Sequence, residues 1–271
     1  DISARFRAYI GEVDNDLKAT LHSGLEFIHW DKYINSHSRV FVKPNFTFPQ
    51  YSEGVTTSPD VLRAFLELLI YRAGRVIVGE SDGGNNSFKA EDSFEGHGMY
   101  KVCKELDIEL VNLSRLLSRM IESKIQGKTV KVQLSEILLD GNIDCFISVP
   151  VLKVHVMTGV SLSIKNLWGC YPDPMRGLYH KDLDRKLTLL TKTLSPCLVI
   201  MDATYALNKH GPMFGEPVKM DLIMASDNPV AADALGAALI GIPLKKAGHI
   251  LVAEKEGLGT ANIDNIETNL D

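Results

Sequence analysis

Apolar residues occur along the chain in short runs that alternate with amphipathic stretches. The run at 39–43 (RVFVK) is rich in β-branched and aromatic residues and ends at Pro44, which cannot donate a ladder hydrogen bond, so a strand is predicted there. Ser58 and Pro59 then offer a helix N-cap and a first-turn proline. A helical stripe follows, with a C-terminal cap expected at Gly74: Val61, Leu62, Phe65, Leu68 and Leu69. A second short strand is predicted at 75–78 (RVIV).

The same alternation recurs towards the C-terminus. Strands are predicted at 144–149, ending at Pro150, and at 197–201, ending at Asp202. A further apolar run at 220–225 leads into Ser-Asp-Asn-Pro at 226–229, which predicts the start of a helix over 230–240 that Gly241 and Pro243 terminate. Strands that alternate with helices favour an α/β fold, Rossmann-like and doubly wound, with one or more mostly parallel sheets and flanking helices. Residues 1–271 are expected to form one unit, and the choice between one sheet and two closely packed lobes stays open.

Polar and charged side chains follow the predicted strands. Ligands of open parallel sheets bind beyond the carboxyl ends of the strands, where loops and helix N-termini converge. We therefore expect one cleft that holds Lys43, Asn45, Glu80 or Asp82, Lys153, His155, Lys165 and Asp202.

The densest group of such residues lies between Val151 and His180. Lysine supplies a positive charge, and imidazole moves a proton near neutral pH or ligates a metal. Together they predict recognition of a carboxylate or phosphate, with acid–base work on it. The predicted catalytic residues are His155, His180 and Lys165, and the predicted substrate-binding residues are Lys43, Asn45, Lys153, Asn166, Asp82 and Asp202. A surface loop is one alternative. A divalent metal held by the two histidines and a carboxylate such as Asp202 is another.

Charge supports a local anion site. Between 151 and 192 there are seven Lys and Arg against three Asp and Glu, within a chain whose net charge is −5. A basic segment in an acidic protein favours a small anionic molecule as partner over nucleic acid. Neither a G-x-G-x-x-G nor a P-loop motif occurs. The chain lacks an apolar run long enough to cross a bilayer and does not begin like a signal peptide, so we expect a cytoplasmic protein with no membrane partner.

The four cysteines, at positions 103, 145, 170 and 197, lie far apart in the sequence and contain no C-x-x-C pair. We expect reduced, partly buried thiols and no iron-sulfur cluster on this chain itself.

Several strings of the sequence resemble one uncharacterised family, catalogued as domain of unknown function 362. The strings are VKPNF at 42–46, RVIVGESDGG at 75–84, SVPVLKVHVMTGVSLSIKNLWG at 148–169 and ASDNPVAADALGAALIG at 225–241. Members of that family often occur beside ferredoxin-type iron-sulfur modules. The resemblance implies a ferredoxin-type redox partner, whose cluster would lie outside this chain.

A second likeness is confined to the central segment. The order His155, Thr-Gly-Val at 158–160, Lys165, Trp-Gly at 168–169 and His180 is similar to a stretch of lactate racemase-type proteins. There, histidines and a lysine hold a nickel-pincer nucleotide and shuttle a proton or hydride, which implies those roles for His155, Lys165 and His180. Serines stand here in place of that family's glycine pair and Asn166 in place of its serine, so the cofactor is not carried over.

These observations favour an enzyme of redox or isomerase class that acts on a small organic acid. The alternatives are a non-catalytic ligand or cofactor carrier that serves an iron-sulfur partner, and a domain of purely structural role.

Overall fold

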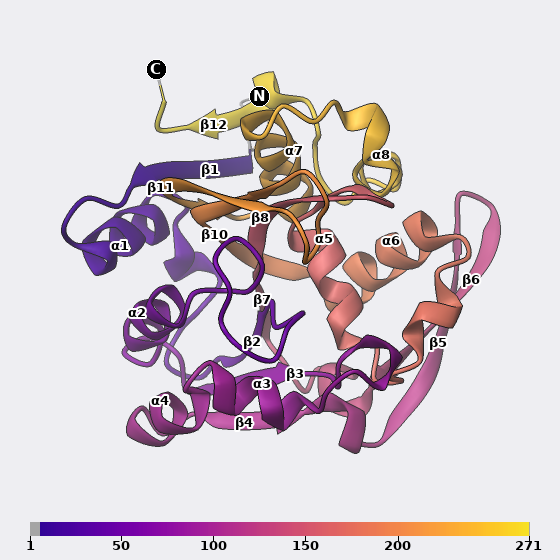
Figure 1. Ribbon diagram of the computed structural model, residues 1–271, viewed down its shortest axis with the longest axis horizontal. Coiled ribbons are helices and arrows are strands. Elements are labelled where there is room, and N and C mark those ends of the chain that lie inside the picture. The colour runs from indigo at the N-terminus through magenta and orange to yellow at the C-terminus, as the bar shows by residue number, and fades with distance from the viewer. Residues whose placement is uncertain (1–5, 271) are drawn as a thin grey trace.

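The computed structural model describes residues 6–270, and its centre is a sheet of ten strands. Eight of these strands lie in the order β12-β1-β11-β10-β7-β2-β3-β4, and β8 pairs with β10 and carries β9 (Figure 1). The neighbours β10, β7, β2, β3 and β4 are parallel, whereas β11 is antiparallel to both β1 and β10. The strands are β1 (Phe6–Glu12), β2 (Arg39–Pro44), β3 (Arg75–Glu80), β4 (Glu109–Asn112), β7 (Cys145–Val149), β8 (Val151–His155), β9 (Gly159–Ser161), β10 (Pro196–Asn208), β11 (Glu216–Ser226) and β12 (Ile266–Thr268).

Helices cover both faces of the sheet. Alternation along β2 sends Val40 and Val42 to one face and Phe41 to the other, because side chains of a strand point alternately to its two sides. The first face packs under α1 (Leu17–Phe27), α2 (Pro59–Leu69), α3 (Ala90–Gly96) and α4 (Met99–Glu105). The second packs under α6 (Leu183–Leu194), α7 (Pro229–Leu239) and α8 (Gly248–Lys255), together with the hairpin of β5 (Ser118–Ile125) and β6 (Lys128–Ser135). The protein is therefore an α/β protein with a mostly parallel central sheet.

The predicted strands at 39–43, 75–78 and 144–149 are confirmed as β2, β3 and β7, and the two capped helices are confirmed as α2 and α7. The Ser58 side chain accepts from the backbone N–H of Val61 at the start of α2. Asn228 accepts from the N–H groups of Val230 and Ala231 at the start of α7. These side-chain caps satisfy backbone donors that the first helical turn leaves free.

Three local predictions were wrong. Helix α2 is capped at Ile70, not at Gly74, whose missing Cβ instead lets the backbone pass close to the Ser36 carbonyl. Leu68 is only partly buried, and Leu66 takes its place in the core. Strand β10 does not end at Asp202 but runs on to Asn208, because β11 pairs with it along that length, across an irregularity in register between Ala203 and Tyr205.

The expectation of four free thiols was also wrong. Cys145 on β7 and Cys197 on β10 form a disulfide, since the two parallel strands are neighbours and bring the Cα atoms to 5.8 Å. Cys103 and Cys170 are free and buried. Within residues 6–270, none of the helices is both long and apolar enough to cross a bilayer.

Candidate functional site

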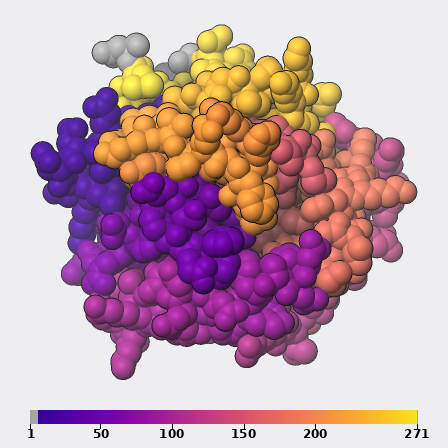
Figure 2. Space-filling model, viewed as in Figure 1, coloured from indigo at the N-terminus to yellow at the C-terminus, as the bar shows by residue number. Residues whose placement is uncertain are grey.

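A cleft of about 250 Å³ lies at the carboxyl ends of β2 and β3 and beside β8, the edge at which parallel sheets bind ligands. Figure 2 shows the hollow between the surfaces of three separate parts of the chain. The short helix α5 (Ser163–Asn166) and the loop around 176–180 complete its wall. The charged and aromatic residues that line it are Lys43, Phe46, Glu80, Lys153, His155, Lys165, Trp168, Arg176 and His180.

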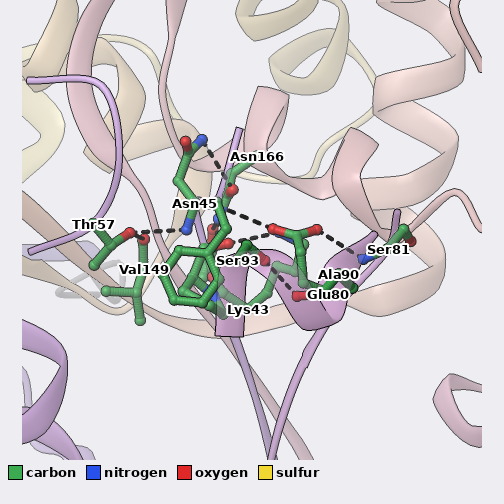
Figure 3. A network of polar contacts seen from close by, with 12 residues as sticks. Lys43, Asn45, Thr57, Glu80, Ser81, Ala90, Ser93, Val149 and Asn166 are labelled. Carbon is green, nitrogen blue, oxygen red and sulfur yellow. Dashed lines mark hydrogen bonds and ion pairs between the residues drawn. The ribbon is translucent and has the colours of Figure 1, made fainter. Parts of the chain in front are cut away.

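The base of the cleft is a buried ion pair. Lys43 Nζ lies 2.6 Å from Glu80 Oε2, and the two side chains are 1% and 4% exposed. Lys43 also donates to the Pro44 carbonyl, while Glu80 accepts from the backbone N–H groups of Phe46 and Ser81 (Figure 3). Such further hydrogen bonds offset part of the cost of removing the two charges from water. Gly169 is required beside it, since a Cβ there would lie 2.8 Å from both charged groups.

Two asparagines position the lysines rather than offering free amide groups. Asn45 Oδ1 accepts from Lys153 Nζ at 3.0 Å, and Asn45 Nδ2 donates to Asn166 Oδ1 at 3.3 Å. Asn166 Nδ2 in turn donates to the Lys43 carbonyl oxygen and to Ser148 Oγ. Thr57 Oγ1 holds the loop by accepting from the Asn45 N–H (Figure 3). The amides thus form a connected network, which fixes the loop that follows β2 against α5.

Lys153 is fully buried on β8. Its ammonium also donates to the Val55 carbonyl oxygen at 2.7 Å, so it is hydrogen-bonded but faces no carboxylate directly. Burial, together with the charges of Lys165 and Lys43, lowers the pKa of Lys153 to about 7.

Lys165 is the least constrained cation of the site. Among residues 6–270 its ammonium makes neither a hydrogen bond nor an ion pair. Burial and the neighbouring charge of Arg176 lower the pKa of Lys165 to about 8. Its helix is held in place by Asp233 of α7, which accepts from the N–H groups of Ser163 and Ile164 at 2.8 and 2.9 Å.

Arg176 adds a permanent positive charge, because a guanidinium does not titrate in proteins. One of its nitrogens donates to the Asp82 carbonyl oxygen at 2.6 Å. This contact joins the 176–180 loop to the loop after β3, and Asn85 N donates to the Pro174 carbonyl oxygen across the same junction.

Both predicted histidines line the cleft. His155 Nδ1 accepts from the Met157 N–H at 3.1 Å, so the neutral ring carries its proton on Nε2. Burial, followed by the charges of Lys165 and Lys153, lowers the pKa of His155 to about 3. The His180 ring lies 5.6 Å from the Trp168 ring, and burial with the charges of Lys165 and Arg176 lowers the pKa of His180 as well. Both shifts favour the neutral form of the imidazole.

The structure brings seven of the nine predicted site residues to the cleft: Lys43, Asn45, Lys153, His155, Lys165, Asn166 and His180. Asp82 and Asp202 lie outside its lining. Asp82 accepts from Ala90 N and Asn112 Nδ2 and so begins α3. Asp202 accepts from the backbone N–H of Ser58, where α2 begins, and from Thr204. Both carboxylates therefore accept hydrogen bonds from backbone N–H groups near helix starts and do not line the cleft.

The sequence did not predict Arg176 and Trp168 as residues of the site. Arg176 belongs to the basic segment, which was a usable signal, but a long loop separates it from the strand ends. Trp168 is 5% exposed and packs in the core while lining the cleft, and its Nε1 is buried without a hydrogen-bond partner among the described residues. As for the metal alternative, residues 6–270 contain no group of three or more His, Cys, Asp or Glu side chains placed to hold an ion.

The fold and site together define an α/β protein with a cationic cleft at the carboxyl edge of its parallel strands. The chain belongs to the family described as Domain of unknown function (DUF362), whose model matches residues 40–238. It is 28% identical over 209 residues to the thylakoid-associated protein sll1697 of Synechocystis sp., an alignment that covers 74% of this chain and 62% of that relative. No solved structure matches the chain. These comparisons do not show the likeness to lactate racemase-type proteins.

Proposed function

We propose that this chain binds a small organic acid in the cleft through its carboxylate and moves a proton on the bound molecule, in an isomerase or redox reaction. The observation that carries the proposal is the charge of the lining. The lining contains four cationic residues: Lys43, Lys153, Lys165 and Arg176. Glu80 is the one carboxylate among the described residues of the lining. An excess of cations over carboxylates in a low-dielectric cleft attracts an anion much more strongly than surface lysines do.

Of these cations, Lys165 and Arg176 are the ones free to meet a ligand. Lys43 is paired with Glu80, and Lys153 is held by Asn45 and Val55. Arg176 keeps further N–H donors beyond the one that binds the Asp82 carbonyl, and a guanidinium suits a carboxylate with two parallel hydrogen bonds. We therefore assign the carboxylate to Arg176 and Lys165.

We assign proton transfer to the lysines that titrate near neutral pH and to the histidines of the lining. A general acid or base works best when its pKa lies near the working pH. Burial brings the pKa values of Lys153 and Lys165 to about 7 and about 8. The imidazoles of His155 and His180 also line the cleft and offer ring nitrogens for proton transfer. A redox version of the reaction requires an external electron acceptor, a role for the ferredoxin-type partner.

The alternative function is that of a non-catalytic carrier, which binds the same acid without reacting. Hydrogen–deuterium exchange separates the two. The protein is incubated in D₂O with a panel of short carboxylic, 2-hydroxy and 2-oxo acids, and deuterium at the carbon next to the carboxylate is followed by NMR. Exchange that disappears in the Lys165→Gln and His155→Gln variants supports the enzyme, and binding without exchange favours the carrier.

Binding itself is tested by the melting temperature with increasing sulfate, phosphate or carboxylate. A bound anion stabilises the folded state in a saturable way. Arg176→Gln and Lys165→Gln should weaken this response, whereas Lys192→Gln should not, because Lys192 is an exposed lysine of the same basic segment outside the lining. Equal responses in all three variants would mean that the anion acts elsewhere.

Several sequence-based expectations stay predictions: the doubly wound, Rossmann-like fold, the cytoplasmic location, the iron-sulfur partner, and the lack of nucleic-acid and membrane partners. The relative's printed association with thylakoids makes the location and the membrane question worth testing directly.

A further inference from the structure

Exposed apolar residues stand in the sequence beside residues that line the cleft. Val156 and Met157 follow His155, Leu178 lies between Gly177 and His180, and Phe214 follows Met213. Their exposed fractions are 69%, 62%, 73% and 80%. Within residues 6–270, six large apolar side chains are at least as exposed as Met157, and four of the six are these. We call Val156, Met157, Leu178 and Phe214 the apolar rim.

A backbone contact joins two parts of the apolar rim, the segment after β8 and the tip of the β10–β11 hairpin. The Val156 N–H donates to the Gly211 carbonyl oxygen at 3.2 Å. A Cβ at Gly211 would overlap the Val154 carbonyl oxygen, so only glycine lets the tip of the β10–β11 hairpin approach β8 so closely. In Figure 2 the orange surface of this hairpin stands beside the hollow. Pro212 and Met213 thereby line the cleft, and Phe214 comes next to them.

Exposed apolar surface next to a binding cleft marks a surface that meets an apolar partner. Methionine and leucine adapt their shape to such a partner. The apolar rim follows, along the chain, residues of a lining that holds four cations and one carboxylate, so the partner that fits both carries an anionic group joined to an apolar chain.

We propose that the ligand of this cleft is an amphiphilic acid, whose acidic group binds in the cleft while an apolar chain of several carbons lies along the apolar rim. The inference rests on the proposed function, because the acidic group is the anion that the cationic lining binds. It goes further because it names the substrate class: the cleft should prefer acids with a hydrocarbon tail to short acids such as acetate or oxalate.

A series of straight-chain carboxylates tests the inference. Acetate, butanoate, hexanoate, octanoate and decanoate are titrated into the protein by calorimetry at pH 6.5, each below its micelle concentration. Affinity should rise about two- to fourfold for each added methylene as the chain covers apolar surface. Phe214→Ser and Met157→Ser should lower octanoate affinity more than acetate affinity. Leu117→Ser is the matched control, since Leu117 is 79% exposed but lies outside the cleft lining, and it should change neither.

The outcomes separate this inference from the proposed function. If acetate binds and decanoate binds no more tightly, the inference is overturned and the proposed function stands. If none of the carboxylates and no sulfate binds, both fail. Octanol that binds as tightly as octanoate would also overturn the inference, because the apolar surface would then act independently of the cations, as a docking surface for a protein would.

Discussion

Anion binding in this cleft should take up protons at alkaline pH. Lys153 and Lys165 lose part of their charge near neutrality, because burial and neighbouring cations lower the pKa of Lys153 to about 7 and that of Lys165 to about 8. A bound anion favours the charged form of both and returns their pKa values towards the ordinary value for lysine. Each lysine that was neutral before binding must therefore gain a proton.

The magnitude follows from the two pKa values. At pH 8 about nine-tenths of Lys153 and about half of Lys165 are neutral, so binding takes up about 1.4 protons, against about 0.1 at pH 6. The sign is that lower pH favours binding. The dissociation constant for sulfate, which stays a dianion over this range, should be about twentyfold larger at pH 8 than at pH 6.

Calorimetry in two buffers of different ionisation enthalpy measures the uptake directly. Lys165→Gln should bring it below one proton at pH 8, and Lys192→Gln should leave it unchanged. A sulfate affinity that is the same at pH 6 and pH 8, with an uptake below about 0.2 protons, would refute the reasoning. Sulfate would then bind outside the lysine pair, or the lysines would be fully charged beforehand.

Three further predictions concern stability. Glu80→Gln leaves the Lys43 ammonium buried without its partner and should lower the free energy of unfolding by about 3–5 kcal/mol in urea titrations, a loss that adding Lys43→Met should reduce. Val78→Ala should cost about 2–4 kcal/mol, because Val78 is fully buried, whereas Lys165→Ala should cost under about 1 kcal/mol; the reverse order would make Lys165 structural. Finally, Lys153 and Lys165 bind fewer protons in the folded protein than in the unfolded chain between about pH 7 and 10.5. In the absence of an anion, these two lysines should therefore make the free energy of unfolding increase with pH over that range. Sulfate should reduce that increase.

Local sequence signals were sufficient where the physics is local. Helices begin at Ser58-Pro59 and Asn228-Pro229 because a side-chain oxygen and the fixed φ of proline act within one turn. The apolar runs at 39–43 and 144–149 form buried strands, as short apolar runs of this kind generally do. The prediction failed where distant pairing decides. The extension of β10 depends on β11, and the pairing of Cys145 with Cys197 depends on two strands being neighbours across the sheet.

The candidate site shows the same division. Lys43, Lys153 and His155 could be predicted as cleft residues because each lies at or near the carboxyl end of a strand, whose position in the sheet fixes the side chain. Asp82 follows the end of β3, whereas Asp202 lies within β10, and each accepts a hydrogen bond from a backbone N–H near a helix start. Which N–H groups come near depends on the fold, so the sequence did not predict it. Arg176 reaches the cleft from a short 3₁₀ helix at Arg176–Tyr179, which no periodic pattern in the sequence predicts.

The energetics of the site explain why its parts form one connected network. Four cations at one edge of a sheet repel one another, and burial makes that repulsion more costly than it is in water. The two lysines with almost no exposed surface are hydrogen-bonded: Lys43 to Glu80, and Lys153 to Asn45 and Val55. Those bonds require the loop after β2, the end of β3, and β8 to be in place together. Binding an anion then needs little rearrangement of these groups, so the free energy of the cation–anion contact goes mainly into affinity. Lys165, the cation without a hydrogen bond to a described residue, is where that contact should be strongest.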